Sequence, residues 1–93
     1  MKLHVNFDIG GLSANETIEG ADAPEITRKA KMAIAGRLNF LVASFVRSMS
    51  DVQFAREVVT RYNSAAGVSC APPATCDEFV QWAIAQKLAY VLD

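Results

Sequence analysis

Cys70 and Cys76 are the residues of this chain best suited to redox or metal chemistry. They lack the Cys-x-x-Cys spacing of thiol redox enzymes. A structural zinc ion needs four ligands, and His4 is the only histidine that would join the two thiolates. Because we find no export signal in the N-terminal residues, we predict two free, partly buried thiols, with a disulfide between them as the alternative.

His4 and Asp8 are the second candidate pair, since an imidazole and a carboxylate can act together in general acid–base catalysis. They lie on one face of a predicted strand, but four residues of extended chain separate them by about 13 Å. This distance is too long for a hydrogen-bonded dyad, so we expect His4 to be an ordinary exposed strand residue. We predict no catalytic residue, no metal and no cofactor, and therefore no enzyme.

The basic residues offer a third kind of chemistry, the binding of phosphate. Five of the nine fall on one predicted helix: Arg28, Lys29, Lys31, Arg37 and Arg47. They scatter to several sides of the helical wheel, and the whole chain has a net charge of −1. We therefore favour a solvated surface. A nucleic-acid interface that uses Arg28, Lys29, Lys31 and Arg37 remains the alternative function.

The first elements that position these side chains are strands. Apolar and polar residues alternate over residues 2–9, which predicts a strand with one buried face. Gly10-Gly11 ends it, residues 12–16 are interpreted as a turn, and residues 17–19 as a second, weaker strand. A two-stranded hairpin is marginal alone, so we expect a helix on its apolar face.

One long helix is predicted from Pro24 to residues 47–49, with Asp22 as its N-cap. At about 100° per residue, one apolar stripe follows this helix and is expected to face the core: Ile26, Ala30, Ile34, Leu38, Leu41 and Phe45. Gly36 would lie in mid-helix, where it costs about 1 kcal/mol relative to alanine.

Two shorter helices follow. Ser50 and Gln53 have the spacing of a capping box, and Gly67 marks the end of that helix. After an extended proline-containing connector over residues 68–74, Thr75 and Glu78 repeat the spacing and predict a helix that ends near Gln86. Residues 88–92 are interpreted as a short strand that joins the hairpin; a helix to the C-terminus is the alternative.

The predicted fold class is therefore α+β, with an N-terminal hairpin, one long helix, two shorter helices and a short C-terminal strand. The 93 residues fit a single small domain over 1–93. No apolar run is long enough to span a membrane, and we expect a cytoplasmic protein.

Four apolar residues point away from the main face of their predicted helices: Met32, Phe40, Val46 and Trp82. One interpretation is that the domain packs its long helix on two sides. The other, which we favour for function, is that these residues bind another protein or a second copy of the chain, because such side chains are enriched in interfaces.

The run FAREVVTRYN (residues 54–63), the proline-containing connector and the run DEFVQWAI (residues 77–84) resemble small reading frames of phages and prophages. The resemblance implies an accessory protein that acts as an inhibitor or adaptor by direct contact with a host or viral protein. Inhibitors of host defence are one member of that class.

Overall fold

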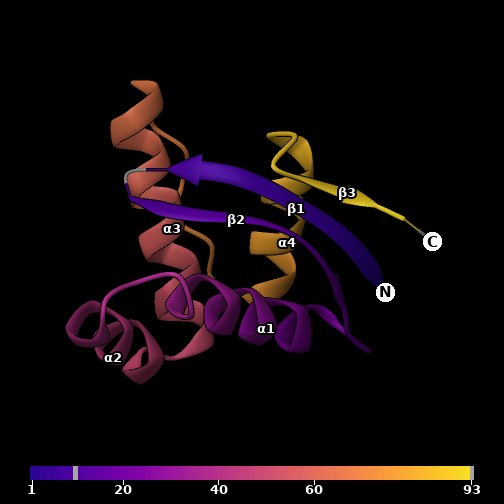
Figure 1. Ribbon diagram of the computed structural model, residues 1–93. Helices are drawn as coiled ribbons and strands as arrows, with labels where there is room; N and C mark the ends of the chain where they lie inside the picture. The colour runs from indigo at the N-terminus through magenta and orange to yellow at the C-terminus, as the bar shows by residue number, and fades with distance from the viewer. Residues whose placement is uncertain (10, 93) are drawn as a thin grey trace.

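The computed structural model describes residues 1–9 and 11–92 and has an α+β architecture (Figure 1). An N-terminal hairpin, four helices and a third strand follow one another along the chain: β1 (Lys2–Ile9), β2 (Leu12–Glu19), α1 (Ala23–Ala35), α2 (Phe40–Ser48), α3 (Asp51–Ala66), α4 (Cys76–Ala85) and β3 (Ala89–Val91). The predicted fold class is confirmed.

The sheet is antiparallel, with strand order β2-β1-β3. Ile9 pairs with Leu12, so a two-residue connection closes the hairpin; Gly11 has φ +90, and Gly10 lies outside the described residues. The predicted turn over residues 12–16 is wrong, because β2 begins at Leu12. Leu12, Ala14 and Ile18 lie on the buried face of β2, in the period-two pattern of a strand. This pattern was hard to recognise in the sequence because the polar pair Asn15-Glu16 interrupts it.

The C-terminal strand is confirmed, and the alternative of a helix to the C-terminus is wrong. Lys87 adopts φ 63 directly after α4, which turns the chain back toward the sheet. Ala89 then pairs with Val5, and Val91 with Leu3. The two chain ends therefore lie at the same end of the sheet (Figure 1).

The predicted long helix is wrong, because the structure contains two helices, α1 and α2, separated by residues 36–39. Gly36 caps the end of α1, and the side chain of Asn39 accepts a hydrogen bond from the Val42 backbone N–H at 3.1 Å, which starts α2. Glycine weakens a continuous helix and asparagine is a strong N-cap, so both residues favour a break here. α2 consequently runs in a new direction (Figure 1).

The caps of the last two helices are as predicted. Ser50 and Gln53 form a complete capping box, and Gly67 ends α3 with φ 69. The Thr75 side chain caps α4, which ends at Ala85. These helices, together with α1, pack against the apolar face of the sheet, and Phe54 contacts Phe79 edge to face at the centre of the core.

Candidate protein-binding site

A group of exposed apolar side chains lies on α2. Four of its nine residues are large, apolar and exposed: Phe40 is 80% exposed, Leu41 79%, Val42 41% and Phe45 67%. We call these four residues the α2 surface. Two exposed phenylalanines and a leucine leave on the order of 500 Å² of apolar side chain in water, about the size of the largest apolar patch on a typical monomer, which is often a functional surface.

The amphipathic character of α2 is inverted. Its buried contacts come from Ala43 and Val46, which are small or medium in size. On the helical wheel the opposite side carries Leu41 and Phe45 together with Ser44 and Ser48. The helix thus presents its larger apolar side chains to solvent and its smaller ones to the core.

The sequence in and around α2 contains few charged residues. Between Lys31 and Asp51 the sequence contains two charged residues, Arg37 and Arg47. Arg37 precedes α2, and Arg47 lies in its last turn, where a cation is favourable for the helix dipole. The centre of the α2 surface is neutral, which is typical of an interface core.

An open groove adjoins the α2 surface. Its volume is about 440 Å³, and its walls come from the C-terminal end of α2 and from α3: Phe45, Ser48, Met49, Gln53, Arg56, Glu57 and Thr60. Phe45 belongs both to the groove and to the α2 surface. An exposed apolar ridge and a groove therefore form one continuous face.

The structure separates the four residues predicted to bind a partner. Phe40 is exposed on α2, and Met32 is 49% exposed on the outer side of α1. Val46 is only 6% exposed, so the expectation that it lies on a free surface is wrong. Trp82 is partly buried, and its ring meets Tyr62 edge to face at 5.2 Å and stacks on Phe79 at 6.0 Å.

For three residues of the α2 surface, the position predicted from the sequence differs from the position in the structure. Leu41 and Phe45 were expected in the core, and this is wrong, because the stripe from Ile26 to Ile34 is buried but does not continue past the break at residues 36–39. Val42 was not singled out at all. Asn39, directly before an apolar run, is the N-cap signal that would have revealed the break and the new phase of α2.

The basic residues do not form one surface. Lys31 is 8% exposed, and its ammonium group donates to the Met49 carbonyl at 2.9 Å and to Asp51 Oδ1 at 3.1 Å. Arg28 and Lys29 both pair with Glu25 on the exposed side of α1. Only Arg37 of the alternative set is exposed without such an acidic neighbour among the described residues.

The residues first considered for chemistry also lie apart. Both cysteines are free thiols, with Cys76 buried and Cys70 partly buried, as predicted. His4 contacts the Thr17 hydroxyl at 3.3 Å on the polar face of the sheet. Within residues 1–9 and 11–92, no three His, Cys, Asp or Glu side chains come together as a metal site.

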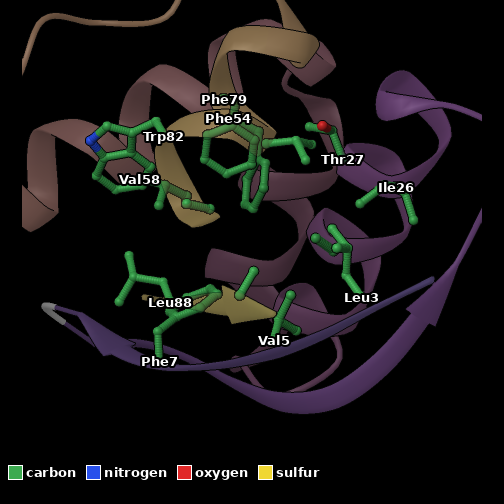
Figure 2. A pocket seen from close by; sticks show the side chains of 14 residues that line it. Leu3, Val5, Phe7, Ile26, Thr27, Phe54, Val58, Phe79, Trp82 and Leu88 are labelled. Carbon is green, nitrogen blue, oxygen red and sulfur yellow. The ribbon is translucent and has the colours of Figure 1, made fainter. Parts of the chain in front are cut away.

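A small cavity lies inside the core, between the sheet and α1, α3 and α4. Its volume is about 30 Å³, close to that of one water molecule. Figure 2 shows its lining, with Leu3, Val5 and Phe7 on the strand side and Phe54, Val58 and Phe79 on the helix side. The lining is almost wholly apolar, so this cavity is a gap in the packing and too small for an organic ligand.

A second apolar area lies on the edge strand β3. Tyr90, Val91 and Leu92 are each about half exposed. Leu92 follows the end of β3, and within the strand Tyr90 and Val91 point to opposite faces, so these two side chains do not lie on one surface. No helix in the described part of the chain has the length and apolar character needed to cross a membrane.

Comparison with known proteins adds no relative: no protein-family model, no curated protein and no solved structure matches this chain. The arguments for function therefore come from the geometry of the site.

Proposed function

We propose that this protein is a non-catalytic protein-binding module that acts through the α2 surface, as an inhibitor or adaptor that works by direct contact. The observation that carries the proposal is the inverted α2 helix, with Phe40, Leu41 and Phe45 between 67% and 80% exposed. Burying such side chains against a protein releases roughly 1.5–3 kcal/mol each. The likeness of residues 54–63 and 77–84 to phage reading frames supports a role as an accessory protein of a phage or other mobile element.

The geometry favours a protein as the occupant. The α2 surface is neutral and apolar at its centre, with an adjoining groove that can accept a side chain. This combination suits the mode in which one helix supplies anchors to a complementary apolar surface. Nucleic acid would require a basic patch, and Lys31, one of the four candidates for it, is buried in an ion pair.

Affinity capture with three matched baits tests the proposal. Wild type and Val68→Asp are expected to retain a specific protein from a lysate of the native cells, because Val68 lies in the connector far from α2 along the chain and is 44% exposed. Phe40→Asp is expected to lose it by at least about tenfold, as for an interface hot spot. Equal capture by all three baits would show that the α2 surface is not the binding site.

A further inference from the structure

We infer that the partner of the α2 surface is acidic: a protein segment in which large apolar side chains are flanked by Asp or Glu carboxylates. The inference rests on the proposed protein-binding function and names the chemistry of the partner. Its basis is that arginines border the exposed apolar side chains of α2, and that no carboxylate in the described part of the chain pairs with them.

Charge is unevenly distributed along the chain. Residues 26–61 contain seven basic and two acidic residues, a net charge of +5. The other residues contain two basic and eight acidic residues, a net charge of −6, which leaves the −1 of the whole chain. The segment that contains α2 is therefore cationic, although the protein as a whole is slightly acidic. A cationic region of this kind attracts the anionic groups of a partner.

Ion pairs within the fold neutralise only part of this charge. Four of the seven basic residues pair with carboxylates: Arg28, Lys29, Lys31 and Arg61. Both acidic residues of the segment, Asp51 and Glu57, are used in these pairs. The other three basic residues are exposed and have no ion pair within residues 1–9 and 11–92: Arg37, Arg47 and Arg56. Their charges are available to a partner.

Two of these arginines border the α2 surface from different sides. Arg47 lies seven residues after Phe40, which is about two helical turns and therefore the same side of α2. Arg56 belongs to α3 and lines the groove together with Phe45, which lies about 140° away from Phe40 around the helix. The Arg56 Nε donates to the Pro73 carbonyl at 3.0 Å, which holds its guanidinium group in place. The exposed apolar side chains thus lie between two cations.

This arrangement fits a partner that combines apolar groups with carboxylates. A guanidinium group can form two parallel hydrogen bonds to one carboxylate. An Asp or Glu at the edge of the contact can reach such a group while the centre of the contact stays apolar. The groove of about 440 Å³ can accept an apolar side chain beside Phe45. A partner without carboxylates would leave the charges of Arg47 and Arg56 uncompensated at the edge of the interface.

Nucleic acid and anionic lipid also carry negative charge, but they match this face less well. Single-stranded nucleic acid stacks its bases on aromatic rings while its phosphates follow a cationic groove. Here Leu41, which is aliphatic, is 79% exposed, and Arg47 and Arg56 lie on different sides of the apolar centre. A bilayer contacts projecting side chains and would leave the groove and Arg56 without a partner.

Selection from a display library of random peptides tests the chemistry of the partner. Wild type and the control Val68→Asp are expected to enrich the same peptides, in which large apolar residues are flanked by Asp or Glu. Phe40→Asp introduces the same charge on the α2 surface and is expected to enrich none of them, because Phe40 is 80% exposed there. Neutral or basic enriched peptides, or the absence of any peptide that depends on Phe40, would contradict the inference.

The other two ligand classes are offered to the same proteins as an oligo(dT) strand and as phosphatidylglycerol vesicles. Both are expected to bind wild type more weakly than the enriched peptides do. If either binds more tightly, and Phe40→Asp abolishes that binding, the face belongs to nucleic acid or to a membrane and the inference is overturned.

Fluorescence anisotropy of one enriched peptide tests the role of the arginines. Arg47→Glu is expected to raise the dissociation constant by about tenfold. Arg28→Glu makes the same change in net charge on the exposed side of α1 and should bind as wild type does. Each acidic residue of the peptide is then replaced by Lys in turn, and one of these peptides should bind Arg47→Glu more tightly than it binds wild type. Such a gain excludes misfolding as the cause of the first loss.

Wild-type affinity in Arg47→Glu overturns the inference, and so does a loss that no Lys-containing peptide restores. Neither result touches the proposed function, which depends on capture of a protein that Phe40→Asp loses. If a protein is captured through Phe40 and an Arg47→Glu bait captures it equally well, the inference fails alone. If the capture is independent of Phe40, both proposals fail.

Discussion

At the scale of single residues, α1 carries two buried polar side chains, Lys31 and Thr27, which differ in their hydrogen bonds. The Lys31 ammonium group bonds both to a backbone carbonyl and to the Asp51 carboxylate, which ties α1 to the junction between α2 and α3. The Thr27 hydroxyl is fully buried and has no hydrogen-bond partner among the described residues. A buried donor without a partner loses its hydration and gains nothing in return.

Thr27→Val is therefore expected to stabilise the protein by about 1 kcal/mol, because it removes the unpaired hydroxyl and keeps the branched shape. In a thermal melt this corresponds to a rise in Tm of about 4–8 °C for a domain of this size. Thr60→Val is the matched control, since the Thr60 hydroxyl is exposed and donates to the Arg56 carbonyl. A fall in Tm for Thr27→Val would mean that the hydroxyl is hydrogen-bonded in solution.

Lys31→Ala is expected to lower the free energy of unfolding by about 2 kcal/mol, because the Met49 carbonyl and the Asp51 carboxylate both lose their hydrogen bond to the Lys31 ammonium group. The Asp51 side chain is 29% exposed, and hydration of that carboxylate keeps the loss at this level. Urea titration measures it as a lower midpoint. Arg28→Ala, which removes an exposed pair at 3.9 Å, should change the free energy by less than about 0.5 kcal/mol. Equal effects of the two variants would be inconsistent with a structural role for Lys31.

At the scale of elements, α2 differs from the other helices. It is nine residues long, and Ala43 and Val46 are its buried residues. Isolated helices of this length are marginal in water, so α2 depends on its Asn39 cap and on these few contacts. A helix this weakly held is suited to gain order when a partner covers it.

Asn39→Ala is expected to speed amide hydrogen exchange in α2 by about fivefold, because loss of an N-cap costs about 1 kcal/mol. Asn39→Asp keeps an acceptor at the cap and should exchange at nearly the wild-type rate. The amides of α3, which has its own capping box, should be unaffected by either change. If Asn39→Ala leaves exchange in α2 unchanged, the side-chain cap does not hold this helix.

The sequence predicted the elements whose signals are local. Alternation identified β1, the capping-box spacings of Ser50 with Gln53 and of Thr75 with Glu78 identified the starts of α3 and α4, and Gly67 identified the end of α3. The break between α1 and α2 was missed because Ile34, Leu38, Leu41 and Phe45 keep helical spacing across it. The spacing of these apolar residues is the same for one continuous helix and for two successive helices. The direction of α2 depends on tertiary contacts, which the spacing of residues in the sequence does not reveal. Of the four exposed residues of the α2 surface, the sequence therefore predicted only Phe40 as a binding residue.

At the scale of the whole molecule, the residues that form the core differ from those that we propose to bind a partner. The core lies between the sheet and α1, α3 and α4, and α2 sits at the periphery beside α1 and α3 (Figure 1). The α2 surface contributes little to that core, because its four side chains face solvent.

Substitutions at two neighbouring residues of α2 should therefore change the free energy of unfolding by very different amounts. Phe45→Ser is expected to change the free energy of unfolding by less than about 0.5 kcal/mol, as for other exposed positions. Val46→Asp, which buries an unpaired charge, should lower it by at least about 3 kcal/mol. Chemical denaturation of both variants checks this contrast. A large loss for Phe45→Ser would place Phe45 in the core and remove it from the binding surface.

Photo-crosslinking in the native cell tests the central claim most directly, that a protein covers the α2 surface. The probe is p-benzoylphenylalanine placed at position 40, with the same residue at position 68 as control; Phe40 and Val68 are both exposed. We predict one discrete crosslinked product from position 40 and none from position 68, and the mass of that product shows whether the partner is a second copy. If position 40 crosslinks no more than position 68, the α2 surface is not an interface and the proposed function is wrong.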